Sequence, residues 1–241
     1  MRVPIDPTGQ TDRPLHLVYE DPILAQRDRA GRAMRRLGEA LIGRDVTVAD
    51  LAEVEALADT MAQRLEVHPP IQREDDYQAR RYTIAPPEDG DRLISFSDRP
   101  ISGPANPAAN DLVLWRDGLK VRGVARFGRL CEASPNRVHG GLSAAVFDDV
   151  MGYVMIVEAT AAYTGELSVR YKAPMRLHEP IHFVAEVTDR GPKVWTITAS
   201  ASAGSPDGEV VGEASGRFVV VSAERLGVTA PLPTGNESGR S

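Results

Sequence analysis

Cysteine is almost absent from the chain. Cys131 is the only one in 241 residues, which excludes an intrachain disulfide and a cysteine zinc cluster. We expect it to lie buried as a small hydrophobic residue. His178 and His182 are four residues apart, but Pro180 lies between them in a strand-like segment, so they do not form a helical metal pair. The sequence therefore predicts no bound metal, and no motif in it indicates a cofactor.

An excess of basic residues, a long apolar run and a serine-hydrolase motif are also missing. Lysine and arginine number 28 against 34 acidic residues, for a net charge of -6, which argues against a nucleic-acid partner. The N-terminus lacks the apolar stretch of a secretory signal, and we expect no window to approach the roughly 18 apolar residues of a membrane span. No G-x-S-x-G elbow occurs, so a serine hydrolase is not suggested. We interpret the chain as a cytoplasmic protein without membrane insertion.

The first half of the chain contains two helix patterns. Asp21-Pro22 marks the start of one, which continues to Gly43, and Thr47 with Asp50 forms a capping box for the second. Apolar residues recur at helical spacing in both, at Ala30, Ala33, Met34, Leu37 and Leu41 and then at Leu51, Val54, Leu57, Ala58, Met61 and Leu65. These stripes need a partner surface, either the rest of the chain or a second subunit. Residues 69–110 are rich in Pro, Gly and charge and predict an irregular connection with a few short strands.

The second half alternates between apolar and polar residues. A hairpin is expected in DLVLWRDGLKVRGVARF, with its turn at Asp117-Gly118, and a helix follows from about Gly141 to Glu158. Four strand patterns come next, around residues 167–172, 181–187, 193–203 and 209–221. The pattern predicts an α+β fold, in which one apolar helix covers an antiparallel sheet. The tail from about residue 229 has a composition typical of disorder.

One stretch carries possible chemistry: HGGLSAAVFDD, from His139 to Asp149. Two adjacent acids in an apolar helix are either on an exposed edge or buried with a partner, and periodicity does not decide between these for Asp148 and Asp149. The glycines Gly140 and Gly141 permit either a tight turn or the approach of a ligand to free N–H groups that could hold a developing oxyanion.

The two ends of this stretch are far apart. Gly140 and Asp148 are eight residues apart, roughly 12 Å along a helix. One chain cannot bring both to a single small carbonyl group. If they share a substrate, they come from different subunits, as in two helices lying antiparallel across a two-fold axis. The stretch therefore implies a homodimer if it implies catalysis.

The segments VHGGLSAAVFDDVMG and AAYTGELSVRYKAPMRLHEPIHFVAEV resemble the hotdog-fold acyl-CoA thioesterases of the PaaI-like type, which are related to phenylacetyl-CoA thioesterases and to thioesterase superfamily members 2 and 4. The resemblance covers about residues 95–222. It implies a hotdog fold, an antiparallel sheet wrapped around a central helix, with an N-terminal helical extension. We accordingly divide the chain into a helical hairpin and connector (1–94), a hotdog domain (95–222) and a flexible tail (223–241).

The resemblance also assigns roles to particular residues. Asp148 matches the catalytic carboxylate, acting as general base or as nucleophile. Gly140 matches the backbone donor to the thioester carbonyl, with Gly141 beside it, and His139 shapes the turn. Thr164, sixteen residues after Asp148, matches a residue that positions water or substrate.

The remaining candidates bind rather than react. Some relatives have an Asn six residues before the His, where this chain has Ala133; Asn136 either replaces it or is a turn residue. Arg137, Arg170 and Lys172 are candidate cations for the phosphates of coenzyme A.

The predicted function is hydrolysis of an acyl-CoA by a homodimer, or by a homotetramer built as a dimer of dimers. The alternative is a hotdog protein that binds or senses acyl-CoA without turnover. A hotdog hydratase would carry its catalytic His before a proline-containing pattern rather than in HGG. An architectural role for the N-terminal hairpin is a further possibility.

Overall fold

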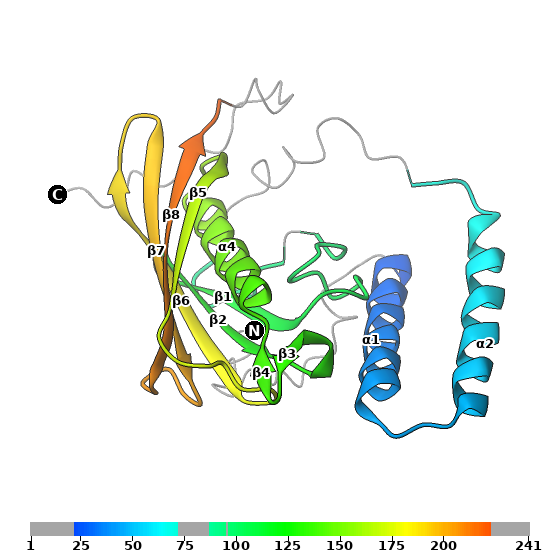
Figure 1. Ribbon diagram of the computed structural model, residues 1–241. Coiled ribbons are helices and arrows are strands. Elements are labelled where there is room, and N and C mark those ends of the chain that lie inside the picture. Colours follow the sequence, from blue (N-terminus) through cyan, green and yellow to red (C-terminus); the bar gives the residue numbers. More distant parts are fainter. Residues whose placement is uncertain (1–21, 72–86, 95, 223–241) are drawn as a thin grey trace.

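The computed structural model describes residues 22–71, 87–94 and 96–222 (Figure 1). Two helices come first, α1 (Pro22–Gly43) and α2 (Val48–Glu66). After the connector, the elements in chain order are β1 (Asp111–Asp117), β2 (Lys120–Arg126), the short 3-10 helix η2 (Arg129–Cys131), β3 (Glu132–Ser134), β4 (Arg137–Val138), α4 (Gly140–Val157), β5 (Ala162–Tyr171), β6 (Pro180–Arg190), β7 (Val194–Ala203) and β8 (Val210–Val220).

Six of the strands form one antiparallel sheet in the order β1-β2-β6-β7-β8-β5, and α4 lies across one face of it (Figure 1). The predicted α+β hotdog arrangement is therefore confirmed. In the first hairpin Asp117 pairs with Lys120, so the two-residue turn is Gly118-Leu119, one position later than predicted. Gly118 occupies its first position with φ 62°, a conformation that glycine adopts without steric cost.

The core forms between α4 and the sheet because α4 is apolar on nearly every side. Phe147 of α4 meets Phe183 of β6 edge to face, and Tyr153 and Met151 are almost completely buried. The expectation that no segment approaches the composition of a membrane span was wrong for this helix, which is long and apolar enough by that criterion. Ten of its residues are buried within the fold, as befits the core helix of a two-layer domain.

The two edges of the sheet differ. The segment 90–93 covers the outer edge of β1 through three backbone hydrogen bonds, in which Gly90 and Leu93 donate to β1 and Arg116 donates back to Asp91. The edge of β5 has no such cover in the described part of the chain, and seven of its ten residues are exposed. An open edge of this length is a ready template for another strand.

A bulge in β5 changes the face on which its first residues lie. Leu167 and Val169 pack against the core, so odd-numbered residues face α4 in the regular part of the strand. The pairing with β8 shifts between Thr164 and Glu166, leaving Gly165 as the extra residue. Because one extra residue inverts the alternation, Thr164 lies on the α4 face although its number is even.

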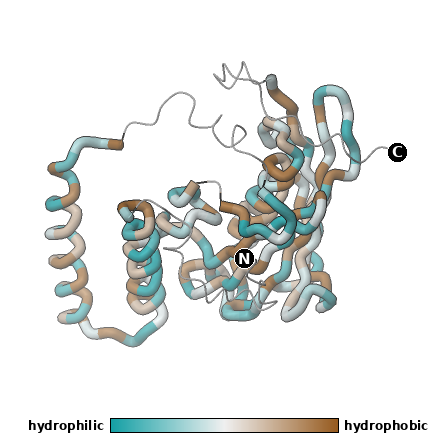
Figure 2. Tube along the Cα trace, turned by 180° about the vertical axis from the view of Figure 1, so that it is seen from behind, coloured by the Kyte–Doolittle hydropathy of each residue, from teal (hydrophilic) through white to brown (hydrophobic). Residues whose placement is uncertain are grey.

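Both N-terminal helices are confirmed, and the capping box of Thr47 and Asp50 is present in both directions. Their packing differs from the simplest expectation. The helix α1 docks on the rest of the chain through a face of small and polar residues that includes Ala25, Asp28 and Gly31, whereas Leu37 and Leu41 stay exposed. No residue of α2 is buried, and this helix stands apart from the rest of the described chain (Figures 1 and 2).

The remaining sequence-based expectations concern the connector, Cys131 and the chain ends. The described part of the connector contains turns and an isolated bridge from Arg92 to Trp115, but no named strand. The short pair β3-β4 was not predicted. Cys131 is buried as expected; its thiol donates to Asn110, and burial raises its pKa, which disfavours a reactive thiolate. Asp21, residues 72–86 and the tail 223–241 lie outside the described residues.

Candidate active site

The two adjacent acids of α4 have different surroundings. Asp149 is 5% exposed and forms an ion pair with Arg99 of the connector. The guanidinium of Arg99 also lies over the ring of Tyr153, and the Tyr153 hydroxyl is 3.2 Å from that of Ser102. The sequence did not decide whether this acid is exposed or buried with a partner, and the structure shows that it is buried and paired. The ion pair joins the connector to α4.

Asp148 faces the β5 side of α4 and is only half-buried. Its Oδ1 accepts a hydrogen bond of 2.8 Å from the hydroxyl of Thr164. The bulge at Gly165 makes this contact possible, because it turns Thr164 toward the helix. The other oxygen, Oδ2, accepts no hydrogen bond from the described residues. A half-exposed carboxylate that is held at one oxygen and open at the other can accept a proton from water.

The start of α4 is shaped by His139, which is its N-cap residue. The Nδ1 of His139 accepts a hydrogen bond of 3.0 Å from the N–H of Gly141, so the imidazole carries its proton on Nε2 when it is neutral. Leu142 and Ser143 donate to the carbonyl of His139. Of the first-turn donors, the N–H of Gly140 is the one without a hydrogen-bond partner among the described residues, so Gly140 rather than Gly141 is available to a ligand.

Tyr171 clamps this helix start from the far end of β5. Its hydroxyl donates to the carbonyl of Gly140 at 2.8 Å. The peptide between Gly140 and Gly141 is therefore held at both ends, by Tyr171 at its carbonyl and by His139 at its N–H. This fixes the orientation of the neighbouring Gly140 N–H. Sequence reasoning missed Tyr171; the only available signal was that it shares the inward parity of Leu167 and Val169.

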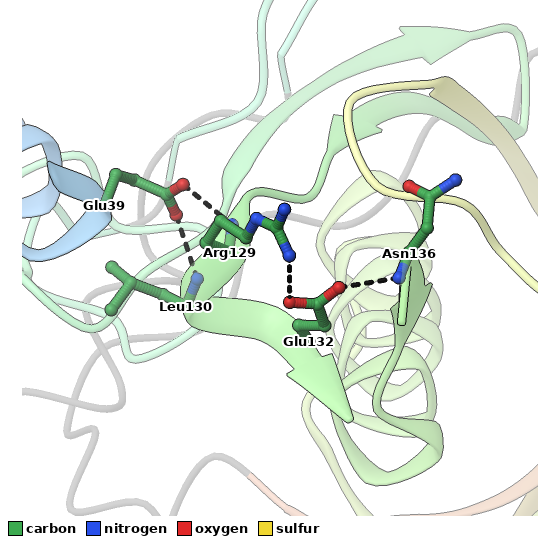
Figure 3. Close-up of polar contacts among 5 residues, drawn as sticks. All are labelled: Glu39, Arg129, Leu130, Glu132 and Asn136. Atoms are coloured by element: carbon green, nitrogen blue, oxygen red, sulfur yellow. Dashed lines mark hydrogen bonds and ion pairs between the residues drawn. The ribbon is translucent and has the colours of Figure 1, made fainter. Parts of the chain in front are cut away.

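A chain of polar contacts links α1 to the turn before His139 (Figure 3). The carboxylate of Glu39 accepts from the N–H groups of Arg129 and Leu130 at 2.7 and 3.0 Å. The side chain of Arg129 pairs with Glu132, which accepts from the N–H of Asn136 at 2.6 Å. This network was also missed, because nothing in the sequence joins residues about ninety positions apart.

Asn136 itself occupies a turn position with φ 60°, which Asn tolerates better than most residues. In the structure the backbone N–H of Asn136, rather than its side-chain amide, donates to Glu132. Its predicted part in holding water stays a prediction.

The predicted cations are not gathered in one place. Arg137 is exposed two residues before the N-cap of α4, and its backbone forms a bridge with that of Arg176, an exposed arginine that sequence reasoning overlooked. Arg170 has the even parity of β5 and lies on the outer face of the sheet, opposite Glu213 of β8. Lys172, the residue after β5, pairs with the same Glu213 at 2.8 Å. A single chain therefore does not bring these two to Asp148.

Among the residues that the structure describes, no group of three or more His, Cys, Asp or Glu is placed to hold a metal ion.

Comparison with known proteins finds a family match over part of the chain. Residues 136–209 match the family model of the thioesterase superfamily. A crystal structure described as a thioesterase superfamily protein is 28% identical, covers 80% of this chain and 90% of its own, and superposes with a TM-score of 0.66. The residues from β1 to the end of the chain number 131 of 241, which is less than the 80% that this structure covers. The match therefore includes part of the chain before β1.

Two further structures are less similar. A hypothetical thioesterase from Streptococcus pneumoniae with coenzyme A is 18% identical, over 42% of this chain and 78% of its own, with a TM-score of 0.40. The E. coli PaaI protein from the phenylacetic acid degradation operon is 13% identical, over 42% and 75%, with a TM-score of 0.39. No curated protein matches the chain.

Proposed function

We propose that this chain, which contains a hotdog domain of the thioesterase superfamily, hydrolyses acyl-CoA thioesters at a site shared by two subunits. The observation that carries the proposal is the hydrogen bond from Thr164 to Asp148, which holds a half-exposed carboxylate beside the open edge of β5. The family supports a thioester substrate. We also propose that the protein acts in the cytoplasm.

Asp148 supplies the base. One of its oxygens is held by Thr164, and the other takes a proton from water as the water oxygen attacks the thioester carbon. The carbon–sulfur bond then breaks, and the departing thiolate takes the proton from the carboxylic acid. The products are the free acid and the thiol of coenzyme A, and Asp148 returns to its carboxylate form.

Gly140 supplies the oxyanion donor. The attacked carbonyl oxygen gains negative charge, and the N–H of Gly140 lies at the positive end of α4, where such charge is stabilised. The clamp by Tyr171 and His139 means that this donor does not have to reorganise during the reaction. Arg137 and Arg176, exposed near this helix start, are the cations best placed for phosphate groups of the substrate.

The edge of β5 unites the two groups. Thr164, with Asp148, lies near one end of this strand, and Tyr171, with Gly140, lies at the other, roughly 23 Å away along the strand. If a second copy adds its β5 antiparallel to the first, with the two-fold axis near Leu167 and Ser168, then Asp148 of each copy lies beside Gly140 of the other. Each dimer then has two sites.

Mixing of two inactive variants tests this arrangement. Asp148→Asn removes the base, and Gly140→Pro removes the N–H donor. Proline suits the first position of a helix, and His139 already has the extended conformation that precedes proline (φ -62°, ψ 130°). Thiol release is measured over a panel of acyl-CoAs for each variant and for the pair refolded together.

If the site is shared between subunits, we expect each variant alone to be inactive. In the mixture, half of the dimers contain one chain of each variant, and each of these dimers has one intact site out of two. The mixture should therefore recover about a quarter of wild-type activity. Recovery of no activity would place the site within one chain. A wild-type protein that binds acyl-CoA but releases no thiol from any panel member would favour the binding or sensing alternative.

A further inference from the structure

The N-terminal helices leave an apolar surface uncovered. In α1 the stripe of Ile23, Ala30, Met34, Leu37 and Leu41 lies on a different face from the one that docks on the connector. Among its larger members the exposed fractions are 60% for Ile23, 49% for Met34 and 39% for Leu41. Nonpolar side chains gathered in this way mark a binding surface rather than an ordinary solvated face.

The helix α2 carries a matching stripe. Leu51, Val54, Ala58, Met61 and Leu65 are spaced alternately by three and four residues, which is the heptad spacing of a helix that packs against another helix. Leu51, Met61 and Leu65 are 42%, 49% and 62% exposed. A helix of nineteen residues with no buried residue gains little from packing on its own chain, so its stability needs a partner.

The charges of the two helices are complementary. In α1 five arginines stand against Asp28 and Glu39, which gives a net charge of +3. In α2 five acidic residues stand against Arg64, which gives -4. A surface on which α2 meets α1 therefore brings opposite charges together, whereas a surface on which α2 meets another α2 brings like charges together.

We propose that α1 and α2 form a dimerisation arm whose partner is the arm of a second copy of this chain, with α2 of each copy packed along α1 of the other. The contact is two-fold symmetric, so the acidic helix meets the basic helix twice. It buries both apolar stripes in a four-helix arrangement. The interface is distinct from the β5 edge and does not depend on the proposed hydrolysis.

Cross-linking of mixed copies is the direct test. Met34→Cys is made in one tagged chain and Ala58→Cys in another, both with Cys131→Ala, since these stripe positions lie near the middle of each helix and stay close whichever way the helices run. After mixing and oxidation, a disulfide-linked dimer of the two different chains is expected. Ala56→Cys, on the opposite face of α2, replaces Ala58→Cys as the matched control and gives at least about tenfold less cross-link.

A second experiment measures the assembly without cysteines. Met61→Glu with Leu65→Glu adds two negative charges to the stripe, and Ala56→Glu with Gln63→Glu adds two to the opposite face. Analytical ultracentrifugation of the full chain is expected to show dissociation at a concentration at least about tenfold higher for the stripe variant, with the control unchanged.

Three outcomes would overturn the proposal. One is the absence of a cross-link between the two different chains, while a third chain that carries both Met34→Cys and Ala58→Cys forms its disulfide internally, since this would mean that the arm closes on itself. Another is equal cross-linking at Ala56 and Ala58. The third is the same dissociation in both glutamate variants. Loss of thiol release in Asp148→Asn has no bearing on these results, so failure of the arm and failure of the proposed function are distinguishable.

Discussion

The helix α4 separates two regions with opposite character. On one side, Asp149 is buried and pairs with Arg99 of the connector, whose guanidinium lies over the Tyr153 ring. On the other side, Asp148 accepts from Thr164 beside the uncovered edge of β5 and is half-exposed. The two acids are neighbours in sequence and identical in chemistry, so their surroundings alone assign one to stability and the other to the candidate reaction.

Asp148→Asn should have the largest effect, on activity. The amide keeps the size of the side chain but cannot take a proton from water, so thiol release should fall about 10²–10⁴-fold. The thermal unfolding midpoint should change little, because the position is partly solvated. Activity near that of the wild type would mean that Asp148 is not the catalytic base.

Asp149→Asn should act on stability instead. It leaves the part-buried guanidinium of Arg99 without its carboxylate partner, and breaking a buried pair costs about 3 kcal/mol. Chemical denaturation followed by circular dichroism measures the loss. The folded fraction should keep its thiol release. An inactive Asp149→Asn beside an active Asp148→Asn would reverse the two roles.

Tyr171→Phe should have a smaller effect. It removes the hydroxyl that holds the Gly140 carbonyl, so the donor N–H is less well oriented. We expect kcat to fall about tenfold with little change in KM, since the substrate itself loses no contact. Tyr163→Phe, at another exposed tyrosine of β5, is the control. A rise in KM at constant kcat would mean that Tyr171 contacts the substrate.

The smallest effect should come from His182, which lies outside both regions. Burial lowers the pKa of this imidazole below its ordinary value of about 6.5. The unfolded chain therefore binds the proton more tightly, so stability falls as the pH drops from about 6.5 to the pKa of the folded state. His182→Gln should flatten this part of the stability curve, measured as unfolding midpoints at a series of pH values. His68→Gln, at an exposed position, should leave the curve unchanged.

The fold was largely predictable from residue patterns. Alternation located the long strands, and the Thr47–Asp50 box located the start of α2. The sequence did not show whether Asp149 is exposed or buried, because its burial depends on an ion pair with Arg99. Arg99 is fifty residues away, in a segment without periodicity. The face of Thr164 also escaped prediction, since simple parity places it outside and only the Gly165 bulge turns it inward. Likewise, an apolar stripe on α1 did not reveal that the helix docks through its small and polar face.

The contact of Glu39 with Arg129 and Leu130 bears on where the chain can be divided. A cut at residue 94 follows the change in sequence pattern, but it would remove the acceptor of two backbone N–H groups. It would also remove Arg35, which donates to the carbonyls of Pro104 and Asn106. A fragment that starts at residue 95 would therefore leave these backbone N–H and carbonyl groups without their partners, close to the turn that leads to His139. The cradle of the candidate oxyanion donor is completed by a helix that the sequence pattern assigns to a different part of the chain.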